Sequence, residues 1–416
     1  MHWLSAHYLK NCVNHSVREN DSLTKITPAS RLSGTPTSIF AVMTKLANEN
    51  NAVNLSQGFP DFNCDPELIE IVREYMIEGN NQYAPMPGVP RLKQGLSNKI
   101  NALYGIRPDP DKEITITAGA TQAIFTIIST FVLPGDEVII FEPAYDSYLP
   151  SVTAMGGIAK PVPLSPTNFS VDWNLFANSI STKTKMVIIN TPHNPCGSLL
   201  TQDDLRILVD FSNKYGFLIL SDEVYEHIIF DGVTHNSLLS FYNDCSNILA
   251  VFSFGKTYHT TGWKVGYIAA REALTSAFRN IHQFTVFAVN TPVQYAYADF
   301  LEDKDRYLSL SAFYQKKRDM LLQGMKDSAF KFTPSRGTYF QLLDYSDLSD
   351  MNDFEFAKLL VNQFNVAVIP LSPFYANGSD LRLIRVCFAK KEQTLQNGIE
   401  RLLTAADHLL NRKATL

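Results

Sequence analysis

The sequence has no excess of basic residues, no long apolar run and no closely paired cysteines. Its 36 Lys and Arg against 41 Asp and Glu give a formal net charge of -5, which supplies no broad positive field for a nucleic-acid backbone. No run approaches the length of a membrane span, and the first twenty residues lack the apolar core of a signal peptide. We therefore expect no nucleic-acid partner and no membrane, and we predict a cytoplasmic protein.

Cysteine is scarce, and the five cysteines are scattered along the chain. An odd number of cysteines without close pairs does not fit a disulfide framework or a zinc site. A reducing compartment and the absence of a metal are the expectation. The cysteines are Cys12, Cys64, Cys196, Cys245 and Cys387.

The length of 416 residues favours about two domains. The middle of the chain repeats a short β-branched apolar run, a turn and a helical stretch, which indicates an α/β fold with a largely parallel sheet covered by helices. The apolar runs are 114–117, 137–141, 185–190, 217–220, 248–254 and 265–270.

The pattern changes near residue 303, where a long charged helix is followed by strand-like runs at 337–344, 366–369 and 381–388. This part reads as a smaller α+β domain. The predicted division is an N-terminal extension at 1–24, an arm with part of the small domain at 25–60, a large domain at 61–302 and a small C-terminal domain at 303–416.

Two charged residues follow apolar strand-like runs. Asp222 comes directly after the run at 217–220, and Lys256 comes after the run at 248–254. Ligands of such sheets bind beyond the carboxyl ends of the strands. Taken alone, an Asp there is more often a helix cap or an ion-pair partner, and a lone Lys is more often a solvated surface group. Their neighbours decide between these interpretations.

The neighbours of Lys256 suit a phosphate. Lys264 adds a second ammonium group and Ser253 a hydroxyl, while the turn at Gly119 starts a helix whose free N–H groups favour an anion. The chain has neither the phosphate loop of nucleotide triphosphate enzymes nor the Gly-x-Gly-x-x-Gly fingerprint. A small phosphorylated cofactor other than a nucleotide is therefore predicted. A rigid proline-flanked turn at 190–195 adds Asn194, whereas His193 is interpreted as structural because it has no triad partners.

This combination resembles the fold type I pyridoxal-phosphate enzymes, class I and II aminotransferases, from about residue 38 to residue 402. Within that family it is most similar to the kynurenine and methionine aminotransferase branch, through QGFPDF at 57–62, NQY at 81–83 and SFGKTYH at 253–259. The family motifs are NTPHNPCG at 190–197, DEVY at 222–225, SFGK at 253–256, GWKVG at 262–266 and Arg385 within IRVCF at 384–388. Cys196 departs from the family, which usually has a small hydroxyl residue there.

The resemblance implies a mostly parallel seven-stranded sheet with helices on both faces and a smaller α+β domain. It also implies that Lys256 carries pyridoxal 5'-phosphate as a Schiff base and acts as general base and acid. Asp222 is expected to keep the pyridine nitrogen protonated, and Tyr225 and Asn194 to bind the phenolic oxygen of the ring. Tyr145 is expected to stack on the ring face.

For the phosphate, the resemblance implies the N–H groups of Ala120, Thr121 and Gln122, together with Ser253 and Lys264. The family tyrosine that matches Tyr83 reaches the phosphate of the partner subunit. We therefore expect a homodimer with composite active sites.

Arg385 is the residue that the resemblance assigns to the α-carboxylate of the substrate, assisted by Asn194 and the backbone of Gly58. Aspartate-specific relatives carry a second Arg near the position of Thr285, whereas residues 284–290 are apolar or small and polar. The expected reaction is ping-pong transfer of an amino group to a 2-oxo acid. The expected donors are apolar, sulfur-containing or aromatic, such as methionine, phenylalanine, tyrosine or a kynurenine-like amino acid.

Two alternatives stay open at this point. A cysteine-conjugate C–S β-lyase on the same fold shares all these residues and differs in the fate of the carbanion. An aminotransferase-like sensor domain of a transcription regulator needs a DNA-binding module, and the region before Ser38 is too short for one with its own core.

Overall fold

The computed structural model describes residues 30–32 and 37–414. The chain divides into two units, a larger one from Pro36 onward and a second one before it. Of the second unit, the described residues form a short turn in which the N–H of Leu32 donates to Ser30 Oγ over 3.1 Å. The predicted extension at 1–24 lies outside the described residues.

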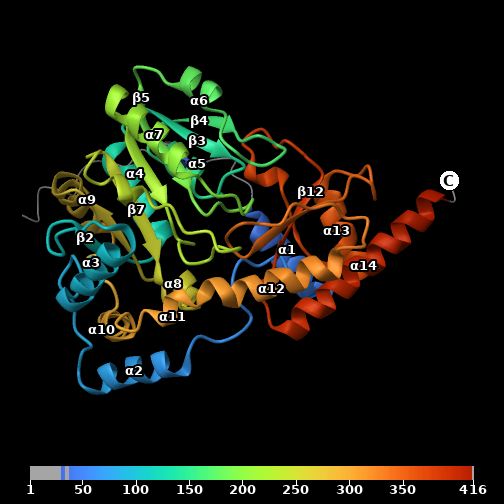
Figure 1. Cartoon of the computed structure of the whole chain (residues 1–416), viewed down its shortest axis with the longest axis horizontal. Coiled ribbons are helices and arrows are strands. Elements are labelled where there is room, and N and C mark those ends of the chain that lie inside the picture. The colour runs from blue at the N-terminus through green and yellow to red at the C-terminus, as the bar shows by residue number, and fades with distance from the viewer. Residues whose placement is uncertain (1–29, 33–36, 415–416) are drawn as a thin grey trace, which may run out of the picture. The chain divides into compact units, whose positions relative to one another are not determined.

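A seven-stranded sheet forms the centre of the larger unit, with the order β2-β8-β7-β6-β5-β3-β4 (Figure 1). All neighbours are parallel except β8, which is antiparallel to both β7 and β2. The predicted mostly parallel sheet is confirmed. The strands are β2 (Ile114–Thr117), β3 (Glu137–Glu142), β4 (Ile158–Pro163), β5 (Thr184–Asn190), β6 (Leu218–Asp222), β7 (Ile248–Ser253) and β8 (Gly266–Ala270).

Alternate residues of the strands face two different layers of helices, as the side-chain period of a strand requires. Val138 and Ile140 of β3 pack in the cluster that contains residues of α4 (Ala120–Phe131), α5 (Tyr148–Ala154) and α9 (Glu272–Thr285). Ile139 and Phe141 pack in the cluster on the other face. That face is covered by α3 (Pro90–Tyr104), α6 (Trp173–Ser179), α7 (Gln202–Tyr215) and α10 (Thr291–Phe300).

A third hydrophobic cluster joins the start and the end of the chain. In it, the antiparallel sheet β11-β12-β9 and the parallel pair β1-β10 pack with α1 and the C-terminal helices. The elements are α1 (Ile39–Glu49), β1 (Val53–Asn54), α12 (Leu310–Met325), β9 (Phe340–Asp344), α13 (Asp353–Phe364), β10 (Val366–Ala367), β11 (Ile369–Pro370), β12 (Leu383–Cys387) and α14 (Glu392–Ala414). The predicted division near residues 60 and 303 is retained as a proposal.

The remaining elements are short or lie at the edges of these clusters. They are α2 (Pro66–Ile77), η1 (Leu238–Phe241), α8 (Phe254–Thr257), η2 (Thr261–Trp263), α11 (Asp305–Leu308) and η3 (Ser372–Phe374). Side chains fix several helix starts: Asp65 caps α2 with Pro66 at the first position, and Thr201 and Asp204 form a capping box at α7.

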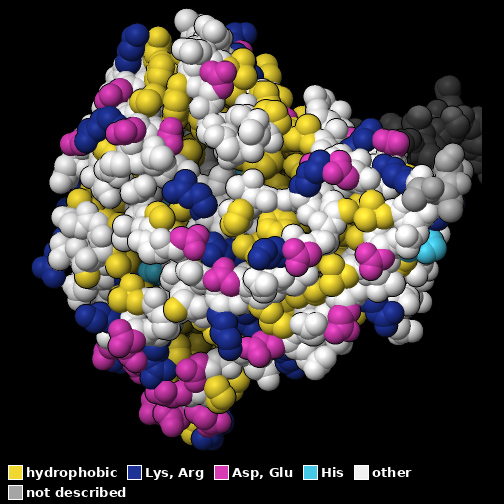
Figure 2. All heavy atoms as spheres, turned by 45° about the vertical axis from the view of Figure 1, so that its right-hand side comes forward, with side chains coloured by type: hydrophobic (Ala, Val, Ile, Leu, Met, Phe, Trp, Pro, Cys, Tyr) yellow, Lys and Arg dark blue, Asp and Glu magenta, His cyan; other side chains and the backbone are white. Residues whose placement is uncertain are grey.

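The surface seen in Figure 2 carries Lys and Arg side chains interspersed with Asp and Glu, with no broad basic field on this face. Through residues 30–32 and 37–414, no helix is both long and apolar enough to cross a membrane. Within the same ranges, no group of three or more His, Cys, Asp or Glu side chains is arranged to hold a metal ion.

Candidate active site

A cavity of about 250 Å³ lies at the carboxyl ends of the parallel strands, the edge at which such sheets bind ligands. It collects almost all the predicted site residues, although they come from segments far apart in the sequence. Those in its lining are Gly58, Ala120, Thr121, Tyr145, Asn194, Asp222, Tyr225, Ser253, Lys256, Lys264 and Arg385.

Asp222 is the last residue of β6 and is only 4% exposed. Its Oδ2 accepts a hydrogen bond from Tyr148 Oη over 2.6 Å, and its Oδ1 accepts one from the N–H of Val224 over 3.3 Å. Burial raises the pKa of the Asp222 carboxyl to about 6, against the lowering effect of these donors. The carboxylate is thus fixed in direction and ionised at neutral pH.

Lys256 lies in α8, the single turn that follows β7. Its Nζ donates to Tyr339 Oη over 2.9 Å and to the carbonyl of Gly58 over 3.4 Å. Burial, together with the charges of Arg385 and Lys264, lowers the pKa of the Lys256 amine to about 8, against the raising effect of Cys387 and Asp222. The amine is therefore neutral, and hence nucleophilic, in a larger fraction near neutral pH than an ordinary lysine.

The start of α4 forms a cradle for an anion. Gly119, at φ 81°, precedes the helix, and no side chain caps the first turn, so the backbone N–H groups of Ala120 and Thr121 are directed at the cavity. A Cβ on Gly119 would lie 3.5 Å from Lys264 Nζ, which places that ammonium beside the helix start. Ser253 faces Gly266 in the β7–β8 pair and lines the same cavity.

The side chain of Tyr145 faces the cavity beside this cradle, whereas that of Gln122 does not. Tyr145 lines the cavity, and its Oη lies 3.4 Å from Thr121 Oγ1. The side chain of Gln122 instead accepts from the N–H of Ala118 over 2.9 Å and donates to Thr126 Oγ1 over 2.7 Å. Gln122 therefore offers an anion only its backbone N–H.

Arg385 comes from the middle of β12 and is 1% exposed. Its Nη1 donates to Asn194 Oδ1 over 2.8 Å and its Nη2 to the carbonyl of Ser56 over 3.3 Å, while the guanidinium stacks 3.9 Å from the ring centroid of Phe340. Nε has no hydrogen-bond partner among the described residues, and no described carboxylate forms an ion pair with the group. Burial lowers the pKa of Arg385 from its usual value.

Asn194 is itself held by a residue that the sequence did not single out. Its N–H donates to Asn190 Oδ1 over 2.7 Å, and Asn190 Nδ2 donates to the carbonyl of Asp222 over 2.8 Å. The turn after β5 is thereby tied to the end of β6. His193 is absent from the cavity lining, and burial lowers the pKa of its imidazole to about 4.

Tyr225 and Tyr339 enclose Lys256. Their rings meet edge to face with centroids 5.1 Å apart, and Lys256 Nζ lies 5.5 Å from each centroid. Tyr339 Oη also donates to the carbonyl of Gly58 over 2.6 Å. Tyr339 lies just before β9, so only the fold brings it to this site.

Tyr83, unlike the other predicted site residues, lies neither in the lining of its own chain's cavity nor next to a lining residue in the sequence. Its side chain is 82% exposed and packs edge to face on Phe287, with ring centroids 5.2 Å apart. It is absent from the cavity lining.

Comparison with known proteins agrees with this geometry. Residues 50–402 match the model of the family "Aminotransferase class I and II". Over 376 residues the chain is 46% identical to methionine aminotransferase of Escherichia coli strain K12, covering 90% of this chain and 97% of that protein. It is also 32% identical to a kynurenine–oxoglutarate transaminase of Dictyostelium discoideum, covering 90% and 96%.

Solved structures give the same result. YbdL of Escherichia coli, identified as having a methionine aminotransferase function, superposes with a TM-score of 0.89 at 46% identity, over 91% of this chain and 100% of that one. N-Succinyldiaminopimelate aminotransferase of Mycobacterium tuberculosis superposes with a TM-score of 0.88 at 33% identity, over 91% and 100%. The chain belongs to the class I and II aminotransferases.

Proposed function

We propose that this aminotransferase uses pyridoxal 5'-phosphate, held by Lys256, to move the amino group of an uncharged amino acid to a 2-oxo acid. The donors we propose are apolar, sulfur-containing or aromatic, and the mechanism is ping-pong. The relatives named for methionine and kynurenine support this substrate class.

The residues present fit this cofactor. A helix start without a side-chain cap and the ammonium of Lys264 suit its phosphate. Asp222, buried and ionised, suits a protonated pyridine nitrogen. When bound, pyridoxal 5'-phosphate supplies a ring that takes up the electron pair released at the substrate Cα.

The chain's own residues perform the remaining tasks. Lys256 Nζ would hold the cofactor and would move the proton released at the substrate Cα. Asp222 keeps the proton on the pyridine nitrogen. Tyr225 and Asn194 would donate hydrogen bonds to the phenolic oxygen, and Tyr145 would cover one ring face.

The buried guanidinium of Arg385 is the observation that carries the proposal. A buried cation without an ion-pair partner is costly; the described residues give it hydrogen bonds only to an amide oxygen and a carbonyl, and Asp146 acts on it at longer range. A substrate carboxylate supplies the missing charge with a bidentate geometry. The carboxylate thus fixes the substrate with its Cα between Arg385 and Lys256.

The part of the cavity left for the substrate side chain is aromatic. Phe40 of α1 lies with its ring centroid 5.2 Å from the Arg385 guanidinium, and the half-exposed Phe59 lines the same mouth. The cations in the described lining are Lys256, Lys264 and Arg385, each with a task already assigned. An acidic side chain would find no partner, whereas methyl, thioether and aromatic groups would bury apolar surface.

We also propose a homodimer in which Tyr83 reaches the phosphate of the partner subunit. The exposed position of Tyr83 beside Phe287 supports this, because a side chain so far from its own cavity is available to another. A cytoplasmic location stays a prediction from the sequence.

The test is an assay of both half-reactions with purified, cofactor-loaded protein. Methionine with a 2-oxo acid should give both the keto product of methionine and the new amino acid, with aspartate as the poor donor. Release of pyruvate and ammonia from a cysteine conjugate, without amino transfer, would instead indicate the β-lyase reaction. Aspartate preferred over methionine would contradict the substrate class.

A further inference from the structure

We infer that Tyr148 is a positioning residue that keeps the Asp222 carboxylate ionised and directed at the cofactor nitrogen; this rests on the proposed function. Tyr148 opens α5 and is 2% exposed. Its Oη lies 2.6 Å from Asp222 Oδ2, the short distance typical of a hydroxyl that donates to a carboxylate. Tyr148 is absent from the cavity lining, so it acts through Asp222.

The tyrosine is held rigidly in this position. Its ring packs in the hydrophobic cluster under α4 and α5, and it meets the ring of Tyr145 edge to face at 5.6 Å. Its backbone N–H donates to the carbonyl of Tyr145 over 3.1 Å. Among the described residues, Asp222 is the hydrogen-bond partner of the Tyr148 hydroxyl. A fixed donor of this kind sets both the orientation and the charge of its acceptor.

The charge of Asp222 results from opposing neighbours. Burial and the carboxylate of Glu223 raise its pKa, while the hydroxyl of Tyr148, the N–H of Val224 and the ammonium of Lys256 lower it. The other titratable groups that face it are the hydroxyls of Tyr145 and Tyr225. Tyr148 is the side-chain donor to this carboxylate within residues 37–414.

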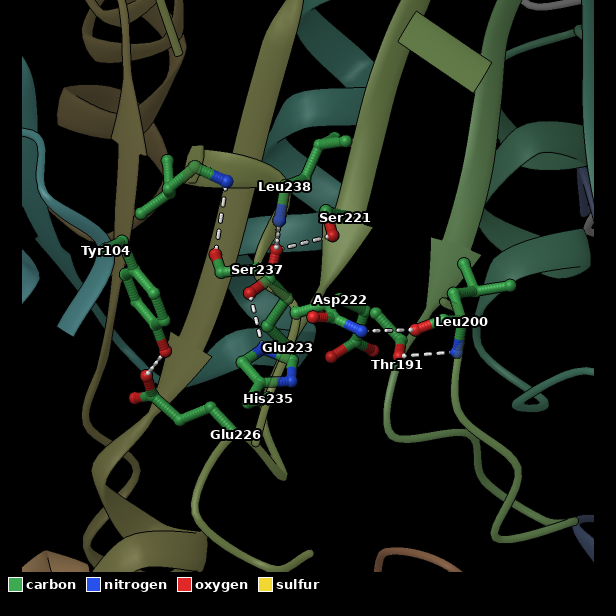
Figure 3. Close-up of polar contacts among 12 residues, drawn as sticks. Tyr104, Thr191, Leu200, Ser221, Asp222, Glu223, Glu226, His235, Ser237 and Leu238 are labelled. Atoms are coloured by element: carbon green, nitrogen blue, oxygen red, sulfur yellow. Dashed lines mark hydrogen bonds and ion pairs between the residues drawn. The ribbon is translucent and has the colours of Figure 1, made fainter. Parts of the chain in front are cut away.

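Glu223 has its own set of donors and does not share Tyr148. Its carboxylate accepts from Ser221 Oγ over 2.8 Å and from the N–H of Leu238 over 3.1 Å, and it lies 2.8 Å from His235 Nε2 (Figure 3). The two adjacent carboxylates are thus stabilised separately. Removing the Tyr148 hydroxyl therefore takes a hydrogen bond from Asp222 and none from Glu223.

The first measurement is the affinity of apo-protein for pyridoxal 5'-phosphate between pH 5 and pH 9, for wild type and Tyr148→Phe. Without the hydroxyl, the acid limb of the affinity profile should move up by about one pH unit. Binding should then be about tenfold weaker than wild type at pH 5 and equal at pH 9. Parallel profiles at every pH would overturn the inference.

The second measurement needs no cofactor. Because the pKa of Asp222 is raised in the folded protein, its protonated form favours folding, and stability is lost as the pH rises through that pKa. Tyr148→Phe raises the pKa further. The unfolding equilibrium constants of variant and wild type should therefore diverge by about a further tenfold between pH 5 and pH 8. In an Asp222→Asn background the divergence should vanish.

Tyr104→Phe is the matched control. Tyr104 Oη also lies 2.6 Å from a carboxylate, that of Glu226, but neither residue lines the cavity (Figure 3). It should leave the cofactor affinity unchanged at every pH. An equal effect of the two variants on affinity would refute the role of Tyr148.

Two further results separate the possible explanations. If Tyr148→Phe does not accumulate as folded protein, Tyr148→Leu removes the same hydroxyl and should show the same raised acid limb; an unshifted profile counts against the inference. If the wild-type protein binds no cofactor, the proposed function fails. The pH-dependent difference in unfolding equilibrium between wild type and Tyr148→Phe still tests the contact between Tyr148 and Asp222.

Discussion

Arg385 Nη1 donates to Asn194 Oδ1 over 2.8 Å, joining β12 to the turn after β5. The contact fixes one edge of a guanidinium that forms no ion pair with a described carboxylate, since Asp146 acts on it only at longer range. Asn194 therefore orients Arg385 without competing for its charge, and leaves that charge to the substrate.

Replacing Arg385 by Lys should lower kcat/KM for methionine by about 100-fold, because an ammonium cannot reproduce the planar bidentate contact. The loss should come mainly from KM. Steady-state kinetics measures it, with Arg382→Lys as the control, since Arg382 is partly exposed and pairs with Asp350. A loss confined to kcat would contradict a role in carboxylate binding.

Replacing Lys256 by Arg should abolish the visible cofactor band and lower turnover by about a thousandfold or more. Arginine keeps the positive charge but has no nucleophilic amine at neutral pH. Absorption spectroscopy of the purified protein checks the first effect. An unchanged cofactor spectrum would refute the assignment of Lys256.

The rate at which apo-protein captures pyridoxal 5'-phosphate should rise with pH, with a midpoint near the pKa of about 8 of the Lys256 amine. The neutral amine is the reactive form, and burial enlarges its fraction at neutral pH. Stopped-flow absorbance gives the profile. A midpoint near the usual pKa of a lysine would show that the amine is not perturbed.

Replacing Phe40 by Arg should raise kcat/KM for aspartate and lower it for methionine and phenylalanine, each by about tenfold. The new cation would meet an acidic side chain at the mouth of the cavity. Ala41→Arg, on the exposed next position of α1, is the matched control and should leave the ratio unchanged. If Phe40→Arg leaves the preference for methionine over aspartate unchanged, the substrate side chain does not bind beside Phe40.

Replacing Glu226 by Gln should lower the free energy of unfolding by about 3–5 kcal/mol, because Lys99 would remain buried without its counter-ion. The two groups lie 2.5 Å apart with side chains 5% and 3% exposed. Burial opposes the charge of Glu226, but Lys99 and His227 hold its pKa below the usual value.

Denaturant titration measures this loss. Glu392→Gln, which removes an exposed partner of Lys316, should leave the free energy of unfolding nearly unchanged, because solvent screens the pair. Similar losses in the two variants would show that burial of the Lys99 pair is immaterial.

The sequence predicted the strands that carry the site, because each is an apolar run followed by a turn residue. Asp222 and Lys256 lie where those runs predicted, and α4 starts directly after Gly119. The edge strand β4 was missed because it is largely exposed and contains Pro161 and Pro163, so that its apolar signal is weak.

Other features depend on contacts between distant segments. Tyr148 and Tyr339 meet Asp222 and Lys256 across 74 and 83 residues of sequence, and no local pattern distinguishes these tyrosines from ordinary core residues. The sequence also does not predict that β8 is antiparallel to its neighbours, because an apolar run does not indicate in which direction its strand crosses the sheet.

The antiparallel pairing of Ser253 with Gly266 brings Lys256 and Lys264 together through the short connection at 254–265. The other groups that would hold the cofactor, among them Asp222 and the start of α4 after Gly119, come from distant segments. Arg385 likewise meets Asn194 across 191 residues. Contacts between distant segments close larger loops, at a higher entropic cost. The two lysines are therefore brought together at a lower entropic cost than Arg385 and Asn194.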